Sequence, residues 1–186
     1  MLNQLDLLEV IDKDGKVVEL ETRTKVHQTG LLHREVYIWF FTSKGEIIFQ
    51  HRAKNKDTFA DKLDATVGGH VEPGMTVEET VVKECFEETG LKLEISNFTF
   101  LTSVHFKSLD KTTKLINNAM RYQYAYLYKE ALSDLRVEVG AADSFEPWSI
   151  EQLEGLSTKD KERFIPTILS KSTLLMLKKA KNNLHL

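Results

Sequence analysis

The sequence predicts an α+β fold in which a mixed sheet packs against one principal helix. Two strand-rich regions, residues 7–67 and 91–128, flank a single well-capped helical segment at 76–89, and this order favours a mixed sheet covered by the helix. A second helical pattern occupies the tail, residues 158–183. The chain has 186 residues, of which 41% are hydrophobic and 28% charged, and this composition is typical of one globular domain.

Two β-hairpins are predicted in the first strand-rich region. In each, two apolar and β-branched runs are separated by a turn that contains glycine. The four runs are residues 7–11, 17–20, 33–42 and 46–51. The polar residues 52–62 are expected to form a loop. A short strand over residues 63–67 follows and ends at Gly68 and Gly69, which are expected to open a second loop.

The helix predicted at residues 76–89 carries both a start and a stop signal. Thr76 and Glu79 have capping-box spacing, and Gly90 stands where helices usually end. Its apolar stripe recurs every four residues and consists of Val77, Val81 and Cys85. The later elements expected are strands within 91–106 and 115–128, a short helix at 150–153, and a helix at 158–183 that is interrupted near Pro166.

Charge, hydropathy and cysteine content exclude several classes of protein. The formal net charge of −3 provides no overall basic field to recruit nucleic acid. No apolar run approaches the ~20 residues of a membrane span, and the N-terminus lacks the basic segment of a signal peptide. Cys85 is the single cysteine, which rules out an intramolecular disulfide and fits a reducing compartment. We therefore expect a cytoplasmic protein with neither nucleic-acid nor membrane partners.

Three glutamates near the end of the predicted helix form an unusual acidic group. Glu84, Glu87 and Glu88 stand at i, i+3 and i+4, so their side chains share one helix face. They repel one another, and the helix dipole disfavours anions in the last turns by ~0.3–1 kcal/mol each. A bound divalent cation explains the group, because Mg²⁺ prefers carboxylate and other oxygen ligands. The alternative is a solvated acidic face in which Lys83 pairs with Glu87.

The stretch from residue 68 to residue 91 resembles the Nudix box, G-x5-E-x7-R-E-U-x-E-E-x-G-U, in which U is aliphatic. Seven of the nine specified positions match: Gly69, Glu84, Cys85 (loosely, at an aliphatic position), Glu87, Glu88, Gly90 and Leu91. Met75 stands in place of a glutamate and Lys83 in place of the arginine. In the family this arginine orients the metal-binding carboxylates and the glutamate lies close by, so we expect positions 75 and 83 to share one charge network. Either one coupled interaction has been replaced, or activity is weakened, because lysine lacks the bidentate fork of arginine.

The resemblance covers about residues 6–155 and implies a fold. The lead-in to the box is similar to that of a Nudix branch that includes isopentenyl diphosphate isomerase. The implied structure is an α/β/α sandwich with a mixed sheet, an N-terminal β-hairpin and a C-terminal helix. We expect three parts: an N-terminal hairpin arm at 1–30, a Nudix domain at 31–155, and a helical tail at 156–186 packed on that domain.

The same resemblance implies a Mg²⁺- or Mn²⁺-dependent pyrophosphohydrolase without an organic cofactor. Its substrate would be a small-molecule diphosphate, of the nucleoside diphosphate type or another organic diphosphate, and a homodimer would suit the family. The implied metal ligands are the carbonyl of Gly68 and the carboxylates of Glu84, Glu87 and Glu88. Glu87 and Glu88 are the implied catalytic residues. The expected substrate-binding residues are Arg52, Gly69 and His70.

Two further interpretations stay open. The isomerase binds a metal through two lead-in histidines and the histidine after the box glycine, and His27, His33 and His70 lie near these positions. However, the isomerase has a catalytic cysteine where this chain has Gly68, so hydrolysis is favoured, and His33 is interpreted as a strand-start residue capped by a neighbour. The other alternative is a nucleotide-binding Nudix module with weak catalysis, suggested by Met75 and Lys83.

The general base is left open between a box glutamate and a distal acid. Family members use either, and the distal candidates in this chain are Glu138, Asp143 and Glu146.

Overall fold

A seven-stranded mixed sheet forms the centre of the molecule. A computed structural model describes residues 7–56 and 58–186. The strand order is β5-β4-β3-β8-β7, with β6 also paired to β3 and β9 to β4. The strands are β3 (His33–Thr42), β4 (Ile47–Arg52), β5 (Leu63–Asp64), β6 (Val67–His70), β7 (Thr99–Leu109), β8 (Ile116–Tyr128) and β9 (Ala142–Trp148). Strand β3 runs parallel to β8 and antiparallel to β4 and β6, which confirms the predicted mixed sheet.

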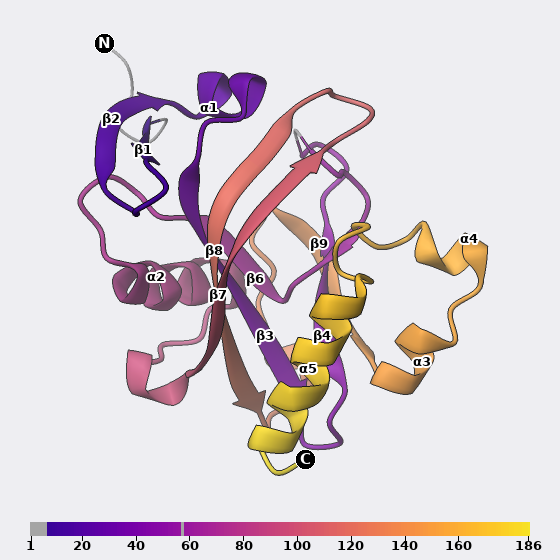
Figure 1. Ribbon diagram of the computed structural model, residues 1–186. Helices are drawn as coiled ribbons and strands as arrows, with labels where there is room; N and C mark the ends of the chain where they lie inside the picture. The colour runs from indigo at the N-terminus through magenta and orange to yellow at the C-terminus, as the bar shows by residue number, and fades with distance from the viewer. Residues whose placement is uncertain (1–6, 57) are drawn as a thin grey trace.

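Helices cover the two faces of this sheet, giving the predicted three layers (Figure 1). The helices are α1 (Arg23–Thr29), α2 (Val77–Thr89), α3 (Ile150–Glu154), α4 (Thr158–Lys161) and α5 (Lys171–Asn183), and two 3₁₀ turns lie at Ile95–Asn97 and Leu132–Asp134. Strand β3 shows why two layers form, because successive side chains point to opposite faces of a sheet. Ile38 and Phe40 join the α2 layer, whereas Trp39 and Phe41 join the layer that contains Leu177 of α5.

The N-terminal hairpin is present as predicted, with β1 (Leu7–Ile11) paired to β2 (Val17–Thr22). Its turn contains Gly15 at φ 81°, a conformation that glycine adopts without strain. Helix α1 follows directly and was not predicted from the sequence. Thr22 caps it by accepting a hydrogen bond from Lys25 N, and Gly30 ends it in the left-handed region at φ 68°.

Helix α2 begins and ends as its sequence signals predict. The capping box between Thr76 and Glu79 is formed in both directions, and Gly90 ends the helix at φ 76°. The predicted stripe of Val77, Val81 and Cys85 is buried against the sheet. This packing leaves the glutamate-bearing side of the last turns facing β6 and β4.

The predicted loop at Gly68 and Gly69 is wrong, because both residues belong to strand β6. They pair with Tyr37 and Val36 of β3, so the predicted strand at 63–67 is divided into β5 and β6 by residues 65–66. Strand β7 begins at Thr99 rather than near residue 91, because a 3₁₀ turn occupies Ile95–Asn97. Strand β9 was missed altogether.

The tail consists of two separate helices instead of one interrupted helix. Between α4 and α5, the backbone follows β5: Leu63 N donates to Arg163 O, and Ile165 N donates to Leu63 O. Pro166 comes next and has no N–H to continue such a ladder or a helix. Among the described residues, no helix has the length and apolar character needed to cross a membrane.

Candidate active site

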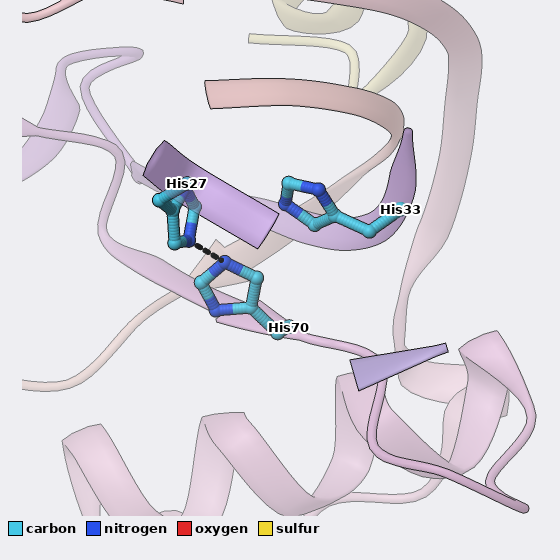
Figure 2. A group of neighbouring side chains, drawn as sticks. All are labelled: His27, His33 and His70. Atoms are coloured by element: carbon cyan, nitrogen blue, oxygen red, sulfur yellow. Dashed lines mark hydrogen bonds between the residues drawn. The ribbon is translucent and has the colours of Figure 1, made fainter. Parts of the chain in front are cut away.

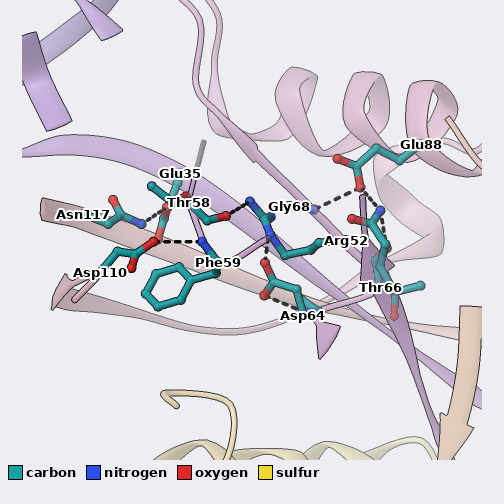
Figure 3. Close-up of polar contacts among 12 residues, drawn as sticks. Glu35, Arg52, Thr58, Phe59, Asp64, Thr66, Gly68, Glu88, Asp110 and Asn117 are labelled. Atoms are coloured by element: carbon teal, nitrogen blue, oxygen red, sulfur yellow. Dashed lines mark hydrogen bonds and ion pairs between the residues drawn. The ribbon is translucent and has the colours of Figure 1, made fainter. Parts of the chain in front are cut away.

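All seven residues predicted to form the site line one cavity of about 740 Å³. Its walls come from α1, α2, the strands β1 and β3 to β8, and loop residues that include Lys56, Thr58, Phe59, Thr113 and Thr167. The predicted residues that line it are Arg52, Gly68, Gly69, His70, Glu84, Glu87 and Glu88. Three of these follow one another in a row, with Gly68 between Arg52 and Glu88 (Figure 3).

Gly69 has a steric role next to Glu84. A Cβ atom at position 69 would lie 2.2 Å from Cδ and 2.5 Å from Oε2 of Glu84. The carboxyl group of Glu84 therefore occupies the space that a side chain at position 69 would need. This close approach of β6 to α2 explains why glycine is required there.

Glu88 is the most deeply buried of the three glutamates. Its Oε2 accepts a hydrogen bond from Gln50 Nε2 at 2.7 Å and a longer one from the Gly68 N–H at 3.4 Å. Burial and the nearby Glu84 carboxylate raise the pKa of Glu88 to about 8, although both hydrogen bonds act in the opposite direction. Gln50 was not predicted; the signal for it was a buried amide directly after the apolar residues Ile47, Ile48 and Phe49 of β4.

Lys83 forms ion pairs with the box carboxylates, and its further partner is Glu72 rather than a group at position 75. Its Nζ lies 2.6 Å from Glu87, 3.2 Å from Glu72 and 3.4 Å from Glu84. Met75 instead packs against the apolar core under α2. The expected charge network between positions 75 and 83 is therefore wrong, and Glu72 supplies the carboxylate that Met75 lacks.

We expect Glu72 and Lys83 to be energetically coupled, and Met75 and Lys83 to act independently. Glu72→Gln and Lys83→Met, singly and together, should show a coupling of ~0.5–1 kcal/mol in the free energy of unfolding, because both side chains are about one third exposed. Met75→Leu combined with Lys83→Met should be additive. Urea unfolding checks both cycles, and additivity of the first one would exclude Glu72 as the replacement partner.

The potential ligand atoms of the three histidines lie closer together than those of the three box glutamates. Within residues 7–56 and 58–186, the group of three potential metal-binding side chains whose ligand atoms all lie within 4.8 Å of one another consists of His27, His33 and His70. The three box glutamates are spread instead, because Lys83 binds Glu87 and Gln50 binds Glu88. Their donor atoms are all oxygens, which fits Mg²⁺ or Mn²⁺.

The three histidine rings lie against one another with centres 5.1 Å apart, and His27 and His70 line the cavity (Figure 2). Nδ1 of His27 lies 3.2 Å from Ile116 O, and Nδ1 of His33 lies 3.1 Å from Leu31 O. These carbonyls select the tautomers in which Nδ1 donates, so that both Nε2 atoms become acceptors. His70 Nε2 then donates to His27 Nε2 at 3.1 Å, and His33 Nε2 is buried without a partner.

Burial opposes protonation of all three imidazoles. It lowers the pKa of His27, with the neighbouring His33 adding to the effect, and it lowers that of His33. The pKa of His70 is well below its usual value because of burial and the nearby Arg23. Burial therefore favours the neutral form of all three imidazoles. His33 does start a strand and bond a neighbour as predicted, but its place in this cluster was not expected.

Arg52 is held rigidly at the wall of the cavity. Its guanidinium donates to Asp64 at 3.1 Å and to the Thr58 carbonyl at 2.9 Å (Figure 3). Of the three distal acids, Glu138 lines the cavity. Asp143 and Glu146 lie on strand β9, and Glu146 bonds Arg163 and Trp148 instead.

Comparison with known proteins identifies the family to which this architecture belongs. Residues 31–168 match the NUDIX domain family. An isopentenyl-diphosphate Delta-isomerase of Serratia proteamaculans is 27% identical over 165 residues, which cover 86% of this chain and 85% of that protein. An uncharacterized Nudix hydrolase of Nostoc is 32% identical over 98 residues, which cover 52% of this chain but only 58% of that protein.

The fold comparison agrees with the sequence comparison. The crystal structure of DR0079 from Deinococcus radiodurans superimposes with a TM-score of 0.68 at 21% identity, covering 92% of this chain and 98% of that one. The predicted Nudix-type sandwich is thereby confirmed. Since the NUDIX match also extends over more than half of the residues, this chain belongs to the Nudix family.

Proposed function

We propose that this protein is a divalent-cation-dependent hydrolase that cleaves the diphosphate linkage of a small organic diphosphate. The observation that carries the proposal is one cavity lined by both carboxylates and basic side chains. The carboxylates are those of Glu84, Glu87 and Glu88, and the basic residues are Arg52, Arg23 and Lys56. A diphosphate needs both kinds of group, because cations must offset its charge while basic groups hold its oxygens.

In this proposal each residue has a defined task. Glu84, Glu87 and Glu88, with the Gly68 carbonyl, hold Mg²⁺ or Mn²⁺, and Glu87 and Glu88 are the catalytic carboxylates. Divalent-cation chemistry of this kind neutralises phosphate charge and makes water more acidic.

The remaining residues position the substrate and provide a proton acceptor. Arg52 binds a diphosphate oxygen from a position fixed by Asp64, while Gly69 keeps space open for Glu84. Glu138 is the distal acid placed to accept a proton from the attacking water, because it alone of the three distal candidates lines the cavity.

An isomerase-like enzyme is the second candidate, favoured by the histidine cluster and by the isomerase relative. Imidazole nitrogens suit Zn²⁺, Fe²⁺ or another transition metal. However, a side chain at position 68 would begin 3.1 Å from the Tyr37 ring, so a thiol has little room there. Cys85 of α2 is buried in the core, and burial raises the pKa of its thiol to about 11. Neither position offers a thiol that could protonate a double bond in the cavity.

The deciding experiment incubates the protein with ADP-ribose, UDP-glucose, NAD and isopentenyl diphosphate, each in Mg²⁺ and in EDTA. We expect release of a nucleoside monophosphate or phosphate in Mg²⁺ that EDTA abolishes. Formation of the dimethylallyl isomer faster than any hydrolysis would establish the isomerase instead. Binding of these compounds without any turnover would indicate the weakly catalytic binding module.

A further inference from the structure

The cavity contains a buried ion pair that the proposed hydrolysis does not use. Arg121 of β8 and Glu35 of β3 are neighbours in register, with side chains 7% and 5% exposed, and both line the cavity. Arg121 Nε donates to Glu35 Oε1 at 2.5 Å, and the other oxygen of Glu35 accepts from Asn117 Nδ2 at 2.9 Å. A buried pair of this kind contributes little net stability compared with apolar residues of the same volume, so folding alone does not explain it.

The guanidinium of Arg121 is held between two aromatic rings. Its central carbon lies 3.6 Å from the ring centre of Tyr37 and 3.9 Å from that of Phe106. Both flat faces are therefore covered, and the group can make new contacts only with its edge. Such stacking fixes the plane of an arginine and prepares it for in-plane, bidentate hydrogen bonds.

Most of the hydrogen-bonding capacity of Arg121 is unused within residues 7–56 and 58–186. An arginine has five N–H donors. In this described part of the chain, the bond from Nε to Glu35 is the one that Arg121 makes, so its terminal nitrogens have no acceptor there. Arg121 also lines the cavity. Its terminal nitrogens present a forked donor to whatever fills that space.

Glu35, the partner of Arg121, lies away from Glu88. In Figure 3, Glu35 and Asn117 stand at one end of a row of polar residues and Glu88 at the other, with Arg52 and Gly68 between them. Arg23 and Lys56 also line the cavity, and within the described residues neither makes an ion pair. Glu35 already balances Arg121 and Asp64 balances Arg52, so Arg23 and Lys56 can offset the charge of an added anion in the cavity.

We propose that Arg121 is a specificity-determining residue that binds, edge-on, a second oxyanion carried by the non-phosphate part of the substrate. The oxyanion is a carboxylate or a further phosphate, both of which match the forked donor. This inference rests on the proposed function, since it names the class of diphosphate that the same cavity accepts. It excludes a substrate whose remaining part is a bare hydrocarbon, because that part would cover the free donors of Arg121 without pairing them.

Two matched ligand pairs test the proposal and distinguish the two oxyanions. UDP-glucuronate differs from UDP-glucose by a carboxylate, and NADP differs from NAD by a phosphate. Calorimetry in EDTA measures binding without turnover, and the contact with Arg121 does not involve the cation. We expect the oxyanion-bearing member of at least one pair to bind about tenfold tighter or more. A preference in the UDP-sugar pair alone identifies the oxyanion as a carboxylate, and a preference in the NAD pair alone identifies it as a phosphate.

The variants then assign the preference to Arg121. Arg121→Lys keeps the charge beside Glu35 but loses the fork, and it should reduce the preference to less than about threefold. If this variant does not fold, Glu35→Gln combined with Arg121→Gln removes both charges at similar volume and should have the same effect. Arg163→Lys is the matched control, because Arg163 also pairs with a glutamate and lies over a tryptophan but does not line the cavity.

Three outcomes would overturn the inference: equal affinity within both pairs, no measurable binding of the oxyanion-bearing members, or a preference that survives loss of the fork. Hydrolysis in Mg²⁺ is measured separately. If the protein hydrolyses diphosphates without this preference, the role of Arg121 is refuted and the proposed reaction stands. If it shows the preference without hydrolysis, the proposed reaction is refuted and the role of Arg121 stands.

Discussion

Glu88→Gln is expected to slow hydrolysis strongly and, at the same time, to stabilise the metal-free protein. The loss of rate should be about 10²–10³-fold, the range observed when one group that stabilises transition-state charge is removed. The stabilisation follows from the raised pKa of about 8, since glutamine removes a carboxylate that is costly to ionise in this buried position. One substitution should thus have opposite effects on activity and on stability.

The pH dependence of this stabilisation has a defined sign. The pKa of Glu88 is higher in the folded protein than in the unfolded chain, so the unfolded chain loses its proton first as the pH rises. Stability of the parent in EDTA should therefore fall between about pH 4.5 and pH 8, whereas Glu88→Gln should lack this fall. At pH 7 the difference should be on the order of 3 kcal/mol, and at pH 4 it should vanish.

Added Mn²⁺ should reverse the order of stability. A cation that binds only the folded parent stabilises it by mass action, and Glu88→Gln should gain much less. Thermal unfolding in EDTA and in Mn²⁺ across this pH range measures both effects. Glu87→Gln is the control: its side chain is 45% exposed, so it should weaken Mn²⁺ binding without stabilising the metal-free protein. Parent-like Mn²⁺ affinity in both variants would mean that the glutamates form only a solvated acidic face.

Gly69→Ala is expected to damage the site while leaving the fold nearly unchanged. The new methyl group would overlap the carboxyl group of Glu84, which lies at the end of a flexible side chain and would move away. A displaced ligand should weaken Mn²⁺ binding, and misplacement of a catalytic group by about 1 Å can reduce the rate about 10²-fold. Unfolding free energy should change by less than about 1 kcal/mol, because the backbone of Gly69 is an ordinary strand that pairs with Val36.

Gly68→Ala gives the matched comparison. The new Cβ atom would lie 3.1 Å from the Tyr37 ring. The variant would keep the backbone carbonyl of residue 68, which is proposed as a metal ligand. We therefore expect a smaller loss of Mn²⁺ affinity than for Gly69→Ala. Equal losses in the two variants, measured by calorimetric titration with Mn²⁺, would show that contact with Glu84 is not the reason for glycine at position 69.

Local signals were sufficient to predict helix α2 and the hairpins. The capping box of Thr76 and Glu79 and the stop at Gly90 lie within a few residues of the backbone groups that they satisfy. The hairpin β1–β2 likewise depends on a short turn between two apolar runs. The resemblance to the Nudix box added the site, because Glu84, Glu87 and Glu88 share one face of that helix wherever the helix packs.

Elements that depend on distant partners were predicted less well. Strand β9 forms only because β4 provides its hydrogen-bonding edge, and residues 163–165 leave the helical conformation because β5 binds their backbone. Gly68 and Gly69 resemble a loop in sequence but extend along β3. In each case the stabilising partner lies far away in the chain, where local propensity carries no information about it.

The sequence by itself determined the family, the mixed sheet, the boundaries of α2 and the identity of the acidic group. Only the tertiary structure decided which side chains meet across elements: Glu72 with Lys83, Gln50 with Glu88, Arg121 with Glu35, and the three histidines from α1, β3 and β6. The physical reason is that residues on one helix share a face by their spacing alone, whereas contacts between strands depend on register and on the packing of layers. A glutamate or an arginine in an apolar strand, such as Glu35 or Arg121, signals that a partner exists, and the folded sheet alone identifies it.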